Sequence, residues 1–461
     1  MTRPAVAVLD TPSLGDRSYL VHDGRTGFVV DPQRDIDRML AVADQAKVEI
    51  THVFETHLHN DYVTGGYALA RHTGAAYHVN AADEVSFPHV PVRDGDVVEV
   101  GDLAVRVVAT PGHTFTHLSY VLLADGRPAG VFSGGSLLYG AVGRPDLLGP
   151  RHTHTLARRQ YASVRRLAGR LPDQTVVYPT HGFGSYCAVG AGGADTSTVG
   201  RERVANAALT QDEEGFVAGL LAGLTEWPAY YTRMAALNAA GPPPPDLSPL
   251  RPATPAELRR RLAAGEWVVD LRTRTAFAAG HLRGTVNVGL DGSFATQVGW
   301  LVPGNTPVTL LAPTPAELAE AQRELVRIGI DRPAAASAGT PREWAGGGEL
   351  SRFALATFAD LAAVRAHRPV LVVDVRQRDE WAAARLADAV HVPLHLLAAR
   401  RADLPGGEIW VHCASGYRAA IAASMLVVAG RQVVAVDDDF DRAAAAGLPV
   451  AYDSAPRHAT R

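Results

Sequence analysis

The chain has few cysteines and almost no lysine. Among 461 residues there are two cysteines, Cys187 and Cys413, far apart in the sequence. A disulfide framework is therefore implausible, and a reducing compartment is expected. Lysine occurs once, at Lys47, so arginine supplies nearly all the basic side chains. Because these arginines are scattered and the formal net charge is −4, we expect no nucleic acid and no anionic membrane among the partners.

Long apolar runs are also missing. The opening residues, MTRPAVAVLDTPSLGD, contain no extended apolar core. No stretch approaches the roughly 18 uncharged apolar residues that a membrane-spanning helix needs. We therefore expect neither a signal peptide nor a membrane span and predict a cytoplasmic protein. The hydrophobic share of 47 % is enough for several cores, and the length favours about three domains.

Two low-complexity stretches divide the chain. GPPPPDLSP, at 241–249, should be a stiff extended spacer because proline runs favour polyproline II. REWAGGGEL, at 342–350, is a glycine-rich junction. We predict domains over residues 1–245, 250–348 and 350–456. The sequence leaves the oligomeric state open, with a homo-oligomer as one possibility.

The last two segments repeat each other. VVDLRTRTAFAAGHLRGTVNV, from Val268, aligns without a gap with VVDVRQRDEWAAARLADAVHV, from Val372. Each begins with a short apolar run, as a buried parallel strand does, and each continues with a second apolar run and a helical pattern. Alternating strands and helices predict two α/β units.

Cys413 stands at the end of an apolar run in VHCASGYRAA. We predict a five-residue loop from Ala414 to Arg418 that leads into a helix. Backbone N–H groups of such a loop, the start of the helix and the Arg418 charge all favour thiolate over thiol. The sequence therefore predicts a nucleophilic sulfur. The alternative is a small buried core residue.

These two segments resemble rhodanese domains. The resemblance depends on the DVR…EW strand, on GHLRG at 280–284, and on the Cys-x-x-Gly-x-Arg loop at Cys413, Gly416 and Arg418. It implies that Cys413 accepts a sulfane sulfur as a persulfide and passes it to a nucleophile. In the second copy ARLADA replaces the glycine-histidine motif, which removes no reacting group.

The first copy lacks the nucleophile. Counting back from the glycine that ends each helix, Ala312 falls where Cys413 falls. Alanine cannot hold sulfur. We therefore expect the domain at 250–348 to be inactive in sulfur transfer and to act as a spacer.

In the first 245 residues, histidines follow several strand-like runs. This pattern predicts an α/β sandwich with a site at the ends of its strands. FETHLHNDYVTGG carries His57, His59 and Asp61 at alternating positions. Residues two apart on a strand or at its tip can converge on one point. His113 and His181 also follow apolar runs. Together these residues predict a metal site.

The pattern resembles the metallo-β-lactamase fold and, more narrowly, the persulfide dioxygenases that bacteria fuse to rhodanese domains. Supporting stretches are VVDPQRD, VGRPDLLG, HGFGSYC, TSTVGRERVANAAL and PAYYTRMAALNAAGP. The resemblance implies an αββα metallo-β-lactamase sandwich followed by two α/β rhodanese domains. It also implies one Fe(II) held by two histidines, which map to His57 and His113, and by one aspartate.

That aspartate is missing. The family motif F-[ST]-G-D-[ST]-L reads FSGGSLL in this chain, so Gly135 occupies the ligand position. We expect iron to bind weakly or not at all unless Asp61, Asp146, water or a substrate thiolate fills the gap. His59, Asp61 and His181 are weaker ligand candidates or outer-shell residues.

Two further positions bear on the site. Tyr62 stands where a second metal would need a nitrogen, and Gly135 removes the usual bridging carboxylate. Zinc, and a two-metal hydrolase, are therefore less expected than one iron. Cys187 follows His181 by six residues. It is either a small core residue or a thiol that carries sulfur near the iron.

The resemblance implies sulfane-sulfur metabolism. A low-molecular-weight persulfide would be oxidised to sulfite, and the rhodanese would join sulfane sulfur to sulfite, giving thiosulfate. The expected partners are these small molecules. Three alternatives stay open: a sulfurtransferase without oxygenase activity, a persulfide sensor or scaffold without turnover, and a two-metal thioester hydrolase. The sequence does not identify the thiol that carries the substrate sulfur.

Overall fold

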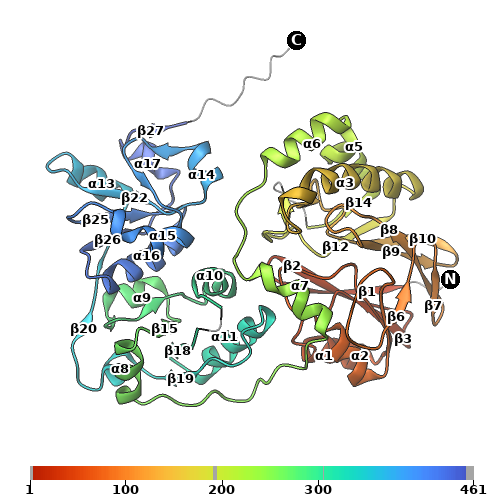
Figure 1. Ribbon diagram of the computed structural model, residues 1–461, viewed down its shortest axis with the longest axis horizontal. Helices are drawn as coiled ribbons and strands as arrows, with labels where there is room; N and C mark the ends of the chain where they lie inside the picture. Colours follow the sequence, from red (N-terminus) through yellow and green to blue (C-terminus); the bar gives the residue numbers. More distant parts are fainter. Residues whose placement is uncertain (1–3, 190–194, 305, 453–461) are drawn as a thin grey trace, which may run out of the picture. The chain divides into compact units, whose positions relative to one another are not determined.

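The computed structural model describes residues 4–189, 195–304 and 306–452. Contacts divide the chain into two compact units (Figure 1). The first runs to Asp246 and also includes Arg323–Asp331, and the second contains Leu247–Gln322 and the chain from Arg332. The break between Asp246 and Leu247 falls inside the proline-rich stretch. Residues 241–250 have no helix or strand.

Two six-stranded sheets make up the first unit. The first sheet contains, in order, β1 (Ala5–Thr11), β2 (Asp16–His22), β3 (Thr26–Val30), β4 (Glu49–Phe54), β5 (Ala76–Asn80) and β6 (Val90–Val92). The second contains β14 (Ser197–Thr198), β12 (Val176–Pro179), β10 (Arg127–Gly134), β9 (Leu118–Ala124), β8 (Leu103–Ala109) and β7 (Val97–Val100). β4, β8, β10 and β12 each end just before a loop that carries a candidate site residue.

Helices cover the outer faces of these sheets. α1 (Asp37–Ala46) and α2 (Gly66–Thr73) pack on the first sheet, and α3 (Pro150–Arg170) packs on the second. A third apolar cluster, rich in aromatic rings, joins the inner faces of the two sheets. The order helix, sheet, sheet, helix confirms the predicted αββα sandwich.

The second unit contains two parallel sheets. Their orders are β17 (Val286–Asn287), β15 (Trp267–Asp270), β18 (Val308–Ala312), β19 (Ala335–Ala338), and β21 (Ala354–Ala356), β26 (Val433–Val436), β25 (Ile409–His412), β22 (Leu371–Asp374), β24 (Val390–His391). The main helices are α8 (Pro255–Ala263), α9 (Arg274–Ala279), α10 (Phe294–Leu301), α11 (Pro315–Arg327), α13 (Phe358–Arg365), α14 (Arg378–Ala383) and α16 (Tyr417–Val428). We refer to residues 250–348 as the first copy and residues 350–452 as the second copy.

The repeat seen in the sequence extends to individual hydrogen bonds. Asp270 accepts from Arg272 at 2.7 Å, and Asp374 accepts from Arg376 at 2.6 Å. Each arginine also donates to a backbone carbonyl eight residues later. In the second copy that carbonyl belongs to Ala384, at the start of ARLADA. The loss of the glycine-histidine motif therefore leaves this turn closed.

A short segment around the end of α11 packs with the first unit. The carbonyl of Arg327 accepts the N–H of Val63 at 2.7 Å, and its guanidinium donates to the buried Asp35 at 2.7 Å. Val63 lies two residues after Asp61. The loop that carries the candidate ligands is therefore held from outside its own sheet.

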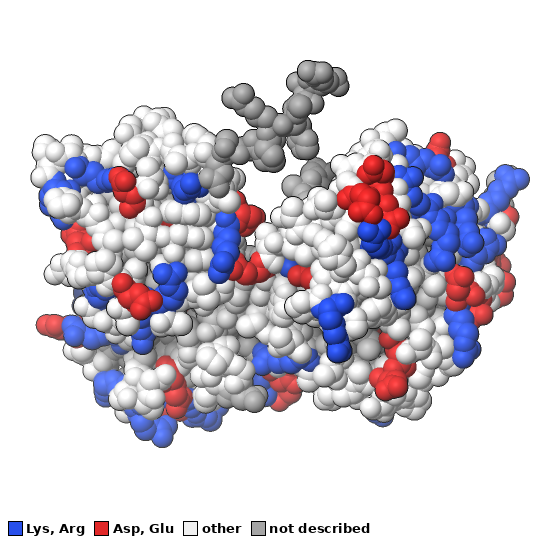
Figure 2. Space-filling model, turned by 45° about the horizontal axis from the view of Figure 1, so that its top comes forward, with Lys and Arg blue, Asp and Glu red and all other residues white. Residues whose placement is uncertain are grey.

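Charged side chains of both signs are interspersed on the face shown in Figure 2. Within the described ranges, no helix combines the length and the apolar character needed to cross a membrane.

Candidate functional site

Three buried histidines converge at the strand ends of the first unit. One ring nitrogen from each of His57, His113 and His181 lies within 4.8 Å of the others. The Nε2 atoms of His57 and His181 are 3.4 Å apart, and the rings of His57 and His113 meet edge to face at 4.8 Å. Two of these histidines come from loops after β4 and β12, and the third precedes β9. The sandwich topology therefore assembles the cluster.

The opposite ring nitrogen of each histidine is held by the protein. Nδ1 of His113 lies 2.8 Å from the carbonyl oxygen of Arg144, and Nδ1 of His57 lies 2.9 Å from Oγ1 of Thr56. Nδ1 of His181 lies 2.8 Å from the carboxylate of Asp16. Such contacts fix the tautomer and the ring direction of histidines that bind metals.

Burial sets the charge of two of these rings. Burial, and then the neighbouring histidines, lower the pKa of His57 well below its ordinary value. Burial likewise lowers the pKa of His113 to about 3. Both rings are therefore neutral at pH 7, which is the form that binds a metal ion. The Nε2 atom of His113 is buried and has no hydrogen-bond partner.

Asp61 and Asp16 flank His181. Oδ2 of Asp61 lies 3.1 Å from Nδ1 of His181. Burial opposes a charge on this ring, but Asp61 and Asp16 together raise the pKa of His181 well above its ordinary value. Burial and the Asp61 charge raise the pKa of Asp16 to about 7. Asp61 therefore contacts the cluster through His181, and its other oxygen is buried without a partner.

His59 belongs to a different set of contacts. Its Nε2 atom lies 3.1 Å from Glu55 and 3.3 Å from Asp31. Although burial opposes it, these carboxylates raise the pKa of His59 to about 9. The Tyr62 ring stacks on this imidazole at 4.3 Å, and its hydroxyl lies 3.0 Å from Nε2. Tyr62 therefore fills space beside His59 and holds the ring toward the two carboxylates.

Gly135 lies against the cluster. A Cβ built on this glycine would be 2.4 Å from Cδ2 and 2.9 Å from Nε2 of His113. Its backbone N–H donates to Nε2 of His117 at 3.0 Å. The position of the missing carboxylate thus borders the histidines, as the family motif implies, but the ring of His113 occupies the space that a side chain would need.

Asp146 is engaged elsewhere. It forms a two-pronged ion pair with the buried guanidinium of Arg144, at 2.7 and 2.8 Å. Arg144 also presents its carbonyl oxygen to His113. A bidentate pair of this kind is among the strongest side-chain contacts. Asp146 therefore orients the cluster through Arg144, and Asp61 is the nearer candidate for an extra ligand.

The three histidines fit one divalent metal ion, which on His181 would replace the Nε2 proton while Nδ1–H keeps its contact with Asp16. Imidazole nitrogens suit zinc and iron alike, the His113 nitrogen lacks any protein partner, and the outer-shell contacts are in place. His59, Asp61 and His181 also lie close enough to offer a second set of donors. His181 belongs to both sets. A third set, Asp31, Glu55 and His59, is closed by the contacts of His59 with its two carboxylates, so the unpartnered nitrogen of His113 favours the histidine cluster as the site of one ion.

Filling the Gly135 position should disturb this cluster. From the family motif alone, aspartate at this position would restore the third ligand and raise metal occupancy. In the structure the Cβ alone would collide with His113. We therefore expect Gly135→Asp to lower metal per chain, and Gly135→Ala to lower it to a similar extent. Elemental analysis of the three proteins, reconstituted with iron or zinc, tests this, and higher occupancy in Gly135→Asp alone would contradict it.

Cys187 is buried beside the same cluster. Burial, followed by the Asp61 and Asp16 charges, raises the pKa of its thiol well above the ordinary value. Its carbonyl accepts the N–H of Arg144 at 2.8 Å. The protein therefore disfavours the thiolate that sulfur transfer needs, which supports the core-residue interpretation of the two that the sequence allows.

Cys413 follows β25 and is enclosed by its loop. The N–H of Gly416 donates to the cysteine sulfur at 3.2 Å. Gly416 has φ +95°, and a Cβ there would be 2.1 Å from Oδ1 of Asp437. Helix α16 begins at Tyr417, so the loop is three residues long and not five. Arg418 lies in the first turn of the helix.

The Arg418 charge is paired. Its two terminal nitrogens donate to the carboxylate of Glu380 at 2.6 and 2.7 Å. The predicted positive charge beside Cys413 is therefore offset by a carboxylate of α14. The N–H of Gly416 is the direct contact to the sulfur that the structure provides.

The sheet register equates Ala312 with Cys413. Asp270 of β15 pairs with Leu311 of β18, and Asp374 of β22 pairs with His412 of β25. The residue after each partner is the alanine in one copy and the cysteine in the other. In the first copy only residues 313–314 separate β18 from α11, so the connection is shorter than the loop at 414–416.

Several residues of the two sites carry no clear signal in the sequence. Asp16 lies 165 residues before its partner His181, and Glu380 lies 38 residues before Arg418. His117 looks like another ligand, but Nδ1 meets Thr110 at 2.8 Å and Nε2 accepts the Gly135 N–H.

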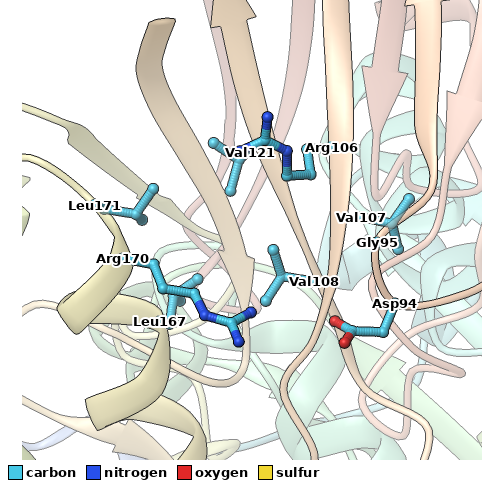
Figure 3. A pocket seen from close by; sticks show the side chains of 9 residues that line it. All are labelled: Asp94, Gly95, Arg106, Val107, Val108, Val121, Leu167, Arg170 and Leu171. Carbon is cyan, nitrogen blue, oxygen red and sulfur yellow. The ribbon is translucent and has the colours of Figure 1, made fainter.

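A separate hollow lies between the end of α3 and the strands β8 and β9. Its volume is about 270 Å³. Figure 3 shows mainly valine and leucine side chains in its lining, with Arg170 and Asp94 extending toward each other. The lining includes none of the clustered histidines and neither cysteine. The hollow therefore offers no nucleophile and no metal ligand of the kind found above.

Two family models match the chain. A model of the metallo-beta-lactamase superfamily matches residues 16–181, which include all three clustered histidines. A rhodanese-like domain model matches residues 357–446, which include Cys413. The predicted fold class is therefore confirmed for these two parts. The rhodanese model matches the second copy, and a rhodanese origin of the first copy stays a prediction.

Curated relatives match part of the chain. A hydroxyacylglutathione hydrolase of Maricaulis maris is 34% identical over 178 residues, which is 37% of this chain and 64% of the relative. Another, from Rhodopseudomonas palustris, is 37% identical over 118 residues, 25% of this chain and 46% of the relative. The chain thus spans less than two thirds of the length of these relatives.

Solved structures extend the similarity further along the chain. A metallo-beta-lactamase from Staphylococcus aureus has a TM-score of 0.66 and 28% identity, and covers 73% of this chain and 99% of its own. ETHE1 from Myxococcus xanthus has a TM-score of 0.44 and 30% identity, and covers 51% of this chain and 98% of its own.

Proposed function

The chain joins a metallo-β-lactamase domain to a C-terminal rhodanese-like domain, and on that basis we propose that it is an enzyme of sulfane-sulfur metabolism. Cys413 transfers sulfur, and the first unit oxidises a low-molecular-weight persulfide to sulfite. The observation that carries the proposal is the 3.2 Å hydrogen bond from the Gly416 N–H to the Cys413 sulfur. A backbone donor aimed at sulfur stabilises a thiolate and, after transfer, the persulfide.

Sulfur transfer at Cys413 conserves charge and electrons. The thiolate attacks the outer sulfur of thiosulfate, the S–S bond breaks, and sulfite leaves with the electron pair. The Cys413 persulfide then yields its outer sulfur to a nucleophile such as cyanide, which regenerates the thiolate and gives thiocyanate. In the reverse direction sulfite accepts the sulfur and thiosulfate forms.

In the first unit, His57, His113 and His181 would hold one iron ion, which when bound would supply the redox chemistry for dioxygen. The protein's part is to keep His57 and His113 neutral and to orient the rings through Thr56 and the Arg144 carbonyl. Burial of the cluster keeps bulk water away from a reactive persulfide.

A thioester hydrolase is the second candidate, because the curated relatives are hydroxyacylglutathione hydrolases. That chemistry uses a water activated by metal. Tyr62 and the pairing of His59 with Glu55 and Asp31 favour a single ion. We therefore rank hydrolysis below persulfide oxidation.

Three assays on the unmodified protein separate these activities. Thiosulfate:cyanide transfer reports on Cys413. Oxygen uptake with glutathione persulfide reports on the iron-loaded first unit, and hydrolysis of S-lactoylglutathione reports on the alternative. We expect the first two. Transfer without oxygen uptake would leave a sulfurtransferase alone, and thioester hydrolysis with two metal ions per chain would favour the hydrolase.

Moving the cysteine to the first copy should not move the activity. In Ala312→Cys combined with Cys413→Ser, the new thiol would follow β18, but the connection at 313–314 lacks a counterpart of Gly416. We expect less than about 1% of the parent transfer rate, because the thiolate and persulfide lack their backbone donor. Stopped assays with thiosulfate and cyanide measure it, with the single variant Ala312→Cys as the folding control. Recovery of a tenth or more of the rate would contradict the proposed inactivity of the first copy.

A further inference from the structure

The first copy contacts the cysteine loop of the second copy directly. Nε of Arg274, at the start of α9, donates to Oδ1 of Asp437 at 2.6 Å. The backbone oxygen of Gly289 accepts the hydroxyl of Tyr417 at 2.7 Å. Tyr417 follows Gly416, the residue whose N–H contacts the sulfur. Both contacts therefore reach the loop within one residue of its hydrogen-bond donor.

Asp437 lies against Gly416 and restricts the position of this residue. A Cβ on Gly416 would lie 2.1 Å from Oδ1 of Asp437 and 3.2 Å from Nε of Arg274. The ion pair thus lies in van der Waals contact with the glycine. The Arg274 side chain is 30% exposed and the Asp437 side chain 19%, so the pair is partly shielded from water. Such a pair holds its geometry better than one on the open surface.

Helix α16, which follows the cysteine loop, also contacts the first copy. The hydroxyl of Ser424, in α16, accepts the N–H of Asn287 at 3.0 Å. The Tyr417 ring packs so closely on Gly292 that a Cβ there would lie 2.5 Å from it. The start of α16 is therefore held by backbone of the first copy on one side and by the Arg274–Asp437 pair on the other.

From these contacts we infer that the first copy, although it lacks a nucleophile, forms part of the Cys413 site, and that Arg274 is its positioning residue. Arg274 acts through Asp437 to keep the Gly416 N–H directed at the sulfur. This inference rests on the proposed sulfur transfer at Cys413. It assigns the first copy a role in thiolate stabilisation beyond that of a spacer.

The electrostatic surroundings of Arg274 support its role as the positioning residue. The hydrogen bond to Asp437, and more weakly the charges of Asp437, Asp291 and Cys413, raise the pKa of Arg274. Arg274 is paired with Asp437 as Arg418 is with Glu380, so removing Arg274 leaves the Asp437 carboxylate beside Gly416 without this partner. Loss of Arg274 should therefore both loosen the loop and reduce the positive potential at the thiolate.

Alkylation of Cys413 tests the inference without requiring turnover. The rate of reaction with iodoacetamide is followed by peptide mass spectrometry between pH 5 and 10 in the full-length protein. In Arg274→Gln we expect about tenfold slower labelling at pH 7 and a rate within about twofold of the parent where the thiol is fully ionised. Arg274→Lys should recover part of the loss. Arg283→Gln, on an exposed arginine of the same copy, should have no effect.

A double variant tests whether Arg274 acts on the loop through Asp437. If Arg274 acts through Asp437, then Arg274→Gln with Asp437→Asn should be no slower than the worse single variant. An unchanged pH profile in Arg274→Gln, faster labelling at every pH, or fully additive losses would overturn the inference. Absence of thiosulfate transfer in the parent would instead overturn the proposed function, because labelling does not depend on it.

Discussion

Cys413→Ser abolishes thiosulfate:cyanide sulfur transfer in the full-length protein, with an expected loss of at least about 10³-fold. Serine keeps the size of the side chain, and its hydroxyl can still accept the Gly416 N–H. It cannot become an anion at neutral pH and cannot form a persulfide. The measurement is the initial rate of thiocyanate formation at saturating thiosulfate.

Cys187→Ser is the matched control, because Cys187 is the other cysteine and is also buried. It lies beside the histidine cluster and not on the rhodanese loop, so it should retain at least about half of the parent transfer rate. Retention of activity in Cys413→Ser, or equal loss in both variants, would contradict the assignment. Mass spectrometry after thiosulfate should find one added sulfur, on Cys413.

Pattern reasoning predicted the placement of candidate residues well where they follow a buried strand. The repeat aligns Asp270 with Asp374, and counting back from Gly329 and Gly430 places Ala312 at the position of Cys413. The sheet register reproduces that equivalence, because a parallel strand fixes which residue leaves its carboxyl end. The same reasoning brought the histidines to one end of the sandwich.

Pattern reasoning failed where a partner distant in the sequence determines the chemistry of a residue. The sequence predicts a full positive charge from Arg418 beside Cys413, but Glu380 pairs with it. The helix after Cys413 begins within the predicted loop, since Gly416 adopts a positive φ and ends it early. Arg274 carries no motif of its own. Its role depends on how two copies of one module face each other, which neither copy encodes alone.

The family motif correctly predicts that Gly135 borders the histidine cluster. It does not predict what fills the space of the missing carboxylate. A missing carboxylate suggests an open coordination position. In the structure the imidazole of His113 fills that space, and the Nε2 atom of His181 lies 3.4 Å from that of His57. Side-chain packing of this kind follows from three loops that are distant in the sequence, so no local pattern reports it.

Metal binding should depend on His113. In His113→Ala we expect the affinity for Fe(II) or Zn(II) to fall by more than about 100-fold, since loss of an outer-shell partner alone costs about 10- to 100-fold. His113 supplies the one imidazole nitrogen of the cluster that is buried without a protein partner. The parent should bind one ion per chain. Both values come from elemental analysis after gel filtration and from competition with a chelator.

His117→Gln is the control for His113→Ala. His117 is equally buried and only four residues away, but both of its ring nitrogens are engaged, with Thr110 and with the Gly135 N–H. It should therefore keep one ion per chain with an affinity within about tenfold of the parent. Equal losses in the two variants would indicate general disruption of the loop. Tight binding in His113→Ala would place the ion on another donor set, such as His59, Asp61 and His181, and would contradict the assignment of the ion to the histidine cluster.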